Sequence, residues 1–252
     1  MPCAAPQSPH NSRSRSHFRN PPGIPHLIEV SAILITLQLA LITTLVLLVI
    51  ATPLAWWLAT TRSALKPAIE AITALPLVMP PTVIGFYLLL LLSPNQPLGS
   101  FWVQMTGETL TFSFTGLVLA SLIYSLPFMV QPLTAAFTQI GALALETAAS
   151  LGAHPVHIFW SIVVPLSARG FVTASVLTFA HTIGEFGIVL MVGGNIPGET
   201  RVVSIAIYEQ VETLNYADAH VLSASLLIFA FVVLALVYTL NKQSPLRLTA
   251  NA

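Results

Sequence analysis

The sequence predicts an all-α, polytopic membrane protein with about five transmembrane helices. Of its 252 residues, 55% are hydrophobic and only 7% are charged, whereas soluble domains carry about 25% charged residues. Nine basic and nine acidic residues are too few to coat a soluble globule of this size, which argues against a soluble enzyme. The zero net charge also excludes a nucleic-acid-binding protein, which needs a clustered basic surface to neutralise phosphates.

Long runs without a charged residue set the positions of the predicted helices. No Asp, Glu, Lys or Arg occurs in four runs of 32, 37, 37 and 23 residues, which cover 30–61, 71–107, 109–145 and 219–241. A bilayer core about 30 Å thick is crossed by roughly 20 apolar residues in a helix. We therefore predict membrane spans near residues 32–60, 71–93, 115–138, 171–194 and 220–241. The fourth span contains one charged residue, Glu185.

The two ends of the chain differ in composition from the predicted spans. The first 25 residues carry six prolines, together with arginines, serines and histidines, and cannot bury a core. We predict a disordered N-terminal tail over 1–26, a transmembrane domain over 27–241 and a C-terminal tail over 242–252.

The motifs of the common enzyme and metal sites are missing from the sequence. The only lysines, Lys66 and Lys242, do not belong to the Gly-Lys-Ser/Thr sequence of a phosphate-binding loop. His154 and His157 lack a third ligand and are separated by a proline, which argues against zinc. We predict no catalytic, cofactor or metal site in this chain, and therefore no enzyme activity of the chain alone.

Residues 146–165, ETAASLGAHPVHIFWSIVVP, carry the most specific motif in the chain. Small residues let a short helix approach a partner closely, and a glycine lets the chain turn out of that helix. The stretch resembles the EAA loop of ABC importer permeases, the cytoplasmic helix that couples a permease to its ATPase. The residues that match the loop are Glu146, Ala148, Ala149, Gly152, Ile162 and Pro165. The gap between the alanine pair and the glycine is one residue shorter than in that loop, and an alanine-rich interfacial helix with no partner is the alternative.

Three further motifs resemble the molybdate permeases (ModB type) within that family. They are LPLVMPPTVIGFYLLL at 75–90, GEFG at 184–187 and NIPGETR at 195–201, and the resemblance covers about residues 28–241. It implies the type I ABC importer permease fold in the plasma (inner) membrane. It also implies a second permease copy (a homodimer), cytoplasmic ATPase subunits that use ATP, and an extracytoplasmic molybdate-binding protein.

The implied function is the inward passage of molybdate, driven by ATP hydrolysis in the partner subunits. Two alternatives stay open, an ABC permease for sulfate or tungstate and an ATP-independent secondary carrier or channel. The EAA loop argues against the carrier, which has no ATPase to dock. Lysine and arginine counts in the loops leave the two orientations nearly tied. The cytoplasmic EAA loop implies that the N-terminus is outside and the C-terminus is cytoplasmic.

Prolines and polar residues inside the spans indicate a pathway or gate. A proline removes a backbone donor, and this is tolerated where the freed carbonyl faces protein or a water-filled cavity, so the second span either lines the pathway or holds a static kink. An acid at a helix centre costs about 2.5–3.5 kcal/mol on insertion scales, which favours a structural or gating role for Glu185 over substrate contact. His181 lies one turn earlier, where the resemblance implies an arginine. The candidate pathway or gate residues are Pro76, Pro80, Pro81, Thr82, Ser125, Thr182 and Glu185.

The outer segment 195–220 is predicted to be an acidic loop. It holds four acidic residues against Arg201, a net charge of −3. Such a loop repels free oxyanions rather than steering them inward. We therefore expect a separate binding protein to capture the anion and to dock on the outer loops, including 195–220.

Overall fold

A computed structural model describes residues 24–241, apart from the side chains of 24–29, 142–144, 149, 240 and 241. The predicted tails therefore lie outside the described residues, except that residues 24–26 begin the first helix. Within the described part of the chain, every regular element is helical, as the sequence predicts.

Three predicted spans are confirmed as single long helices. They are α1 (Ile24–Thr60), α5 (Phe114–Thr138) and α12 (Tyr216–Asn241), each apolar and long enough to cross a membrane. Threonines are tolerated inside α1 because their hydroxyls bond to carbonyls one turn earlier, as Thr36 does to Ala32 at 2.7 Å. α5 is capped at its N-terminus by Ser113, whose side chain accepts a hydrogen bond from the Gly116 amide at 3.1 Å.

The second predicted span, 71–93, is not one continuous helix. It consists of α2 (Lys66–Val78) and α3 (Pro81–Leu92), whose axes are bent by 110°. Met79 and Pro80 between them are extended, because a residue that precedes proline is disfavoured in the helical region. Pro76 lies inside α2, whereas Pro80 caps the start of α3 and Pro81 begins it. The two consecutive prolines thus break the span rather than kink it.

The fourth predicted span, 171–194, is also broken. α9 (Ala168–Gly184) ends before Glu185, whose backbone is extended, and α10 (Gly187–Gly193) begins after Phe186. α9 is preceded by an arm that bends away from it by 72° and is built of α7 (Pro155–Ile158), η1 (Phe159–Val163) and α8 (Val164–Leu166). Glu185 therefore lies at a break between two helices and not on a helix face.

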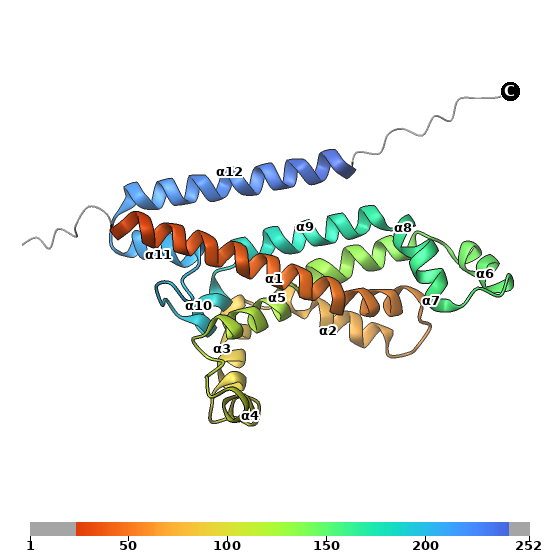
Figure 1. Cartoon of the computed structure of the whole chain (residues 1–252), viewed down its shortest axis with the longest axis horizontal. Coiled ribbons are helices and arrows are strands. Elements are labelled where there is room, and N and C mark those ends of the chain that lie inside the picture. Colours follow the sequence, from red (N-terminus) through yellow and green to blue (C-terminus); the bar gives the residue numbers. More distant parts are fainter. Residues whose placement is uncertain (1–23, 242–252) are drawn as a thin grey trace, which may run out of the picture.

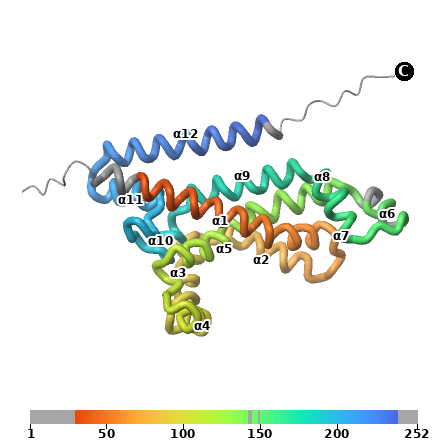
Figure 2. The backbone as a smooth tube through the Cα atoms, viewed as in Figure 1, coloured from red at the N-terminus to blue at the C-terminus, as the bar shows by residue number. Residues whose placement is uncertain are grey.

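Three shorter helices lie outside the spans. They are α4 (Pro97–Thr106), α6 (Ala142–Ser150) and α11 (Val203–Glu212). Figure 1 shows α6 and α7 at one end of the long helices and α10 and α11 at the opposite end. The tube in Figure 2 shows the same arrangement, with α3 and α4 projecting from the side of the bundle. The EAA-like segment and the NIPGETR segment are thus held at opposite ends of the molecule.

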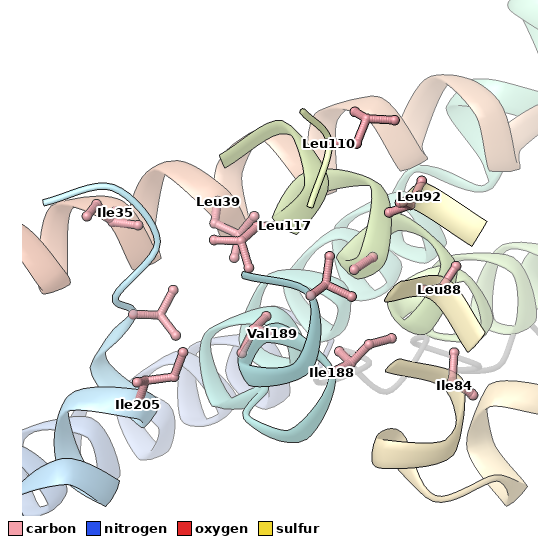
Figure 3. Close-up of a cluster of buried hydrophobic side chains, with 13 residues drawn as sticks. Ile35, Leu39, Ile84, Leu88, Leu92, Leu110, Leu117, Ile188, Val189 and Ile205 are labelled. Atoms are coloured by element: carbon pink, nitrogen blue, oxygen red, sulfur yellow. The ribbon is translucent and has the colours of Figure 1, made fainter. Parts of the chain in front are cut away.

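The core joins the broken spans to the long helices. One cluster, drawn in Figure 3, combines Leu39 of α1, Ile84 of α3, Leu117 of α5 and Ile188 of α10. α3 and α10 approach closely at Gly85, where an added Cβ would lie 2.9 Å from the Met191 Cβ. A second cluster packs α1, α5 and α9 with the arm. Both breaks are therefore fixed by packing.

Candidate functional site

The two broken spans meet at a cavity of about 540 Å³. Its walls come from α3, α5, the end of α9 and the start of α10, and the lining residues are Pro81, Thr82, Tyr124, Ala180, His181, Gly184, Glu185, Phe186 and Gly187. The breaks are in close contact, because a Cβ on Gly187 would lie 3.0 Å from the Pro81 Cγ. Of the predicted pathway residues, the cavity wall contains Pro81, Thr82 and Glu185.

The remaining pathway candidates lie away from this wall. Ser125 and Thr182 are buried behind it, and Pro76 is buried in α2. Pro80 is exposed at the break itself. Tyr124 and Phe186 line the cavity and were missed as pathway candidates, because an aromatic residue within an apolar span gives no signal of its own. His181, noted in the sequence only where the resemblance implies an arginine, lines the cavity as well.

Glu185 is buried, and its backbone carbonyl forms a hydrogen bond with α11. Its carbonyl accepts a hydrogen bond from the Ser204 hydroxyl of α11 at 2.6 Å. Neither carboxyl oxygen has a hydrogen-bond partner within residues 24–241, and no basic side chain described there forms an ion pair with it. His181 does not pair with Glu185 across one helical turn, because α9 ends at Gly184.

His181 is held by α5 instead. Its ring stacks on Phe128, with centroids 3.8 Å apart, and its Nδ1 lies 3.0 Å from the Ser125 hydroxyl. The Thr182 hydroxyl donates to the Thr178 carbonyl at 2.9 Å, so it accepts from Ser125 in their 3.0 Å contact. Ser125 has then used its only proton and accepts from Nδ1–H of His181. Ser125 and Thr182 thus position His181 through its Nδ1.

The EAA-like segment forms a short helix that ends in a tight left-handed turn. Gly152 has a φ of +79°, and the Ala153 amide donates to the Ala148 carbonyl at 3.1 Å. This is the Schellman arrangement that ends a helix with glycine in the left-handed region. Ala148 is buried, Glu146 is exposed, and the side chain of Ala149 lies outside the described residues.

Leu151, at the tip of this turn, is the residue that the sequence prediction missed. Its side chain is 85% exposed. A helix that docks in a groove on another protein places its exposed apolar side chains at the contact.

The arm that follows connects this turn to the long helices. Pro165 has no amide hydrogen, and its ring crowds the preceding turn of the helix. The preceding residues Phe159–Val163 form a wider π-helical turn, in which the Val164 amide donates to the Phe159 carbonyl. Ile162 is half-buried in this turn and Pro165 is exposed in α8. Phe159 packs edge-on against Trp56 of α1 and Phe137 of α5, with centroids 5.7 and 6.3 Å away.

The outer segment 195–220 is not a loop, so that prediction is wrong. It contains α11 and the first turn of α12. Before α11, the buried Thr200 hydroxyl donates to the Gly193 carbonyl at 2.7 Å and accepts from the Ile196 amide at 3.2 Å. Arg201 contacts Glu209 of α11 at 3.1 Å and Asn195 at 2.6 Å. These bonds hold the NIPGETR segment against α11. We call the contacts among Asn195, Arg201 and Glu209 the clasp.

The start of α11 is attached to both α1 and the break at Glu185. The Val203 amide donates to the Thr36 hydroxyl of α1 at 2.9 Å, while Ser204 holds the Glu185 carbonyl. At the other end of α11, the Tyr208 hydroxyl donates to Glu212, and this hydrogen bond raises the pKa of Tyr208. The start of α11 is therefore hydrogen-bonded directly to a residue of the cavity wall.

Comparison with known proteins gives a consistent result. Residues 51–243 match the family described as binding-protein-dependent transport system inner membrane component. The molybdenum transport system permease protein ModB of Azotobacter vinelandii is 54% identical over 211 residues, which cover 84% of this chain and 93% of that protein. The ModB protein of Haemophilus influenzae is 34% identical over 205 residues, which cover 81% of this chain and 88% of that protein.

Solved structures of ABC transporters share the fold. A bacterial alginate ABC transporter, in complex with its alginate-bound periplasmic protein, aligns over 84% of this chain and 78% of its own, with a TM-score of 0.68 and 17% identity. The MetNI methionine ABC transporter in an inward-facing conformation aligns over 86% of this chain and 96% of its own, with a TM-score of 0.68 and 16% identity. At these identities the likeness concerns the fold alone.

Proposed function

The chain belongs to the family of binding-protein-dependent transport system inner membrane components, and from this premise we propose how it works. It is the multi-pass inner-membrane permease subunit of an ABC importer that moves molybdate across the membrane. The observation that carries this assignment is the 54% identity to ModB of Azotobacter vinelandii over 93% of that protein. The sulfate and carrier alternatives are not favoured. Its partners are ABC ATPase subunits and a substrate-binding protein.

The pathway runs along one face of α5. Tyr124, Phe128, Gln131 and Ala135 are spaced by four, three and four residues and so share a helix face. Tyr124 lines the cavity at the two breaks, while Gln131 and Ala135 line a second cavity of about 360 Å³ between α5 and α2. A second copy of the chain closes this face from the opposite side to form a homodimer. The apolar surface of α12, by contrast, faces membrane lipid.

Coupling takes place at the end of the molecule that carries α6. The ATPase docks on residues 146–165 through the exposed turn at Leu151 and Gly152, and the arm carries its movement to α1 and α5 through Phe159. The binding protein docks at the opposite end, on outer surfaces that include 195–220 (Figure 1). On this proposal the N-terminus is outside and the C-terminus is cytoplasmic.

We propose that the energy source lies in the partner subunits and that this chain needs no cofactor of its own. Because the sequence has no phosphate-binding loop, we expect the purified chain alone to hydrolyse no ATP. Reconstitution with the ATPase subunits and the molybdate-binding protein is expected to give ATP hydrolysis and molybdate uptake into proteoliposomes. Hydrolysis by the isolated chain, or uptake without the ATPase, would contradict the assignment.

Phe159 is expected to transmit the movement of the coupling segment. Phe159→Ala removes its contacts with Trp56 and Phe137, so the arm can move without pulling α1 and α5. We expect molybdate uptake per ATP hydrolysed to fall several-fold, while hydrolysis itself persists. Phe159→Tyr, which keeps the ring, is the matched control and should stay near the wild-type ratio. An unchanged ratio in Phe159→Ala would remove the arm from the coupling path.

A further inference from the structure

α5 carries a glutamine, Gln131, within a span that is otherwise apolar enough to cross a membrane. Its side chain is exposed, whereas its neighbours Val130 and Leu133 are buried. Among residues 24–241, the Gln131 amide has no hydrogen-bond partner. An unpaired amide is costly in hydrocarbon, so this side chain is expected to face water or protein rather than lipid tails.

Gln131 lines the cavity of about 360 Å³ between α5 and α2. Figure 1 shows that α2 extends toward the end of the molecule that carries α6 and α7, so this cavity lies on the α6 side of the two breaks. The hydroxyl groups of its wall are already engaged or covered. Thr73 donates to the Glu70 carbonyl at 2.9 Å, and the Thr134 hydroxyl is enclosed by protein. The Gln131 amide is therefore the neutral donor that this wall offers to a ligand.

The exposed face of α5 leads from the cavity at the two breaks to Gln131. Tyr124 lines the first cavity, and Phe128, one turn further along α5, stacks on His181 of the same wall with centroids 3.8 Å apart. Gln131 follows three residues later on this face and lines the second cavity. The two cavities are thus consecutive along one helix.

We propose that Gln131 contacts the transported oxyanion, and that its amide donates N–H hydrogen bonds to the anion as it passes into the cavity between α5 and α2. This inference rests on the proposed transport function and assigns a substrate-contacting residue within it. A tetrahedral oxyanion without protons accepts hydrogen bonds and donates none, so it needs donors along an apolar path, and a glutamine amide supplies two N–H groups. A neutral donor also binds a dianion less strongly than a fixed cation does, so the anion is not trapped.

The charged residues beside this cavity do not exclude an anion. Glu70 lines the cavity, but its carboxylate lies 3.9 Å from Nζ of Lys66, one turn earlier in α2. Arg62, which precedes α2, has an exposed side chain. With two basic residues and one acidic residue, this group carries a net charge of +1. The way out of the cavity is therefore favourable for an anion.

The first test replaces the amide in the complete transporter, with the ATPase and the binding protein in proteoliposomes. Leucine removes the donors, and we expect Gln131→Leu to lose about tenfold in molybdate uptake. Gln131→Glu keeps the shape of the side chain but adds a negative charge, and it should lose still more. Gln38→Leu is the matched control, since Gln38 of α1 is also exposed in a span but lies between the exposed Leu34 and Leu41. It should stay within about twofold of wild type.

The second test asks whether water reaches Gln131. Cys3 is the only cysteine of the chain, so Cys3→Ser provides a background without thiols. In that background, we expect Gln131→Cys in the assembled transporter to react with a positively charged, membrane-impermeant methanethiosulfonate. The reaction should be at least about tenfold faster than that of Phe231→Cys on the lipid-facing surface of α12, because the reagent and the reactive thiolate both require water.

The opposite results overturn the proposal. Normal uptake by Gln131→Glu would show that the anion does not meet this side chain, and an equal loss in Gln38→Leu would show that any amide within a span has the same effect. Slow labelling of Gln131→Cys would place the residue against lipid or against a second copy of the chain. If Gln131→Leu fails to assemble with the ATPase, the labelling rate decides the question. Wild-type uptake of molybdate tests the transport function independently of any change at Gln131.

Discussion

Replacing Gly152 with valine is expected to abolish molybdate uptake and binding-protein-stimulated ATP hydrolysis together. Gly152 has a φ of +79°, a conformation that costs an ordinary L-residue about 1–2 kcal/mol and a β-branched one more. The Schellman turn that it closes carries Leu151, which is 85% exposed. Because a tenfold change corresponds to about 1.4 kcal/mol, we expect both activities to fall by about tenfold or more.

The cause of this loss can be separated from simple crowding. No atom of the described chain lies within 4 Å of a Cβ built on Gly152, so the cost within the subunit is conformational. Gly152→Asn is the matched control, because asparagine tolerates the left-handed region. It should retain most of the uptake, whereas Gly152→Val should still insert into the membrane and remain folded. The measurement is uptake and hydrolysis in proteoliposomes, and normal uptake by Gly152→Val would show that the turn does not couple the subunits.

The unbroken spans and the turn at Gly152 were predictable because local sequence determines them. A charge-free run that is longer than a bilayer crossing and has no consecutive prolines predicts one long helix, and a glycine after a short alanine-rich helix marks the end of that helix. The prolines at 80 and 81 were equally visible, yet their local effect does not specify an angle. The bend of 110° is set by how α3 packs on α10 at Gly85 and Gly187.

The break at Glu185 left less trace in the sequence. No proline marks it, and GEFG reads as part of an apolar helix. The extended backbone there is held by Ser204, 19 residues further along the chain. The same limit explains why the roles of Thr36 and Phe159 were missed, since each depends on a partner that lies far away in sequence.

The candidate site was therefore predictable in its residue types but not in its arrangement. Thr82 and Glu185, two of the predicted pathway residues, lie on the cavity wall. Ser125 and Thr182, chosen for the same hydroxyl chemistry, instead hold His181 in position. The residue type alone could not distinguish a residue that lines the cavity from one that holds a lining residue in position, because both kinds are polar residues within apolar helices.

Thr200→Val is expected to cause the largest loss at the outer end of the molecule. The Thr200 side chain is fully buried, and its hydroxyl satisfies both the Gly193 carbonyl and the Ile196 amide. Valine has nearly the same shape but leaves both groups without a partner, at a cost of about 1–3 kcal/mol for each. The clasp of Asn195, Arg201 and Glu209 is then expected to open and α11 to lose its fixed position.

The consequence should be specific to the step that involves the binding protein. Because α11 holds the Glu185 carbonyl through Ser204, an opened clasp disconnects the outer surface from the cavity wall. We expect stimulation of ATP hydrolysis by the molybdate-loaded binding protein to fall by about tenfold or more, in line with the loss of two buried hydrogen bonds. Basal hydrolysis by the assembled transporter should change little, since α6 lies at the opposite end (Figure 1). Thr200→Ser, which retains the hydroxyl, should stay near wild type. Equal stimulation in Thr200→Val and Thr200→Ser would mean that the binding protein acts through a surface other than this clasp.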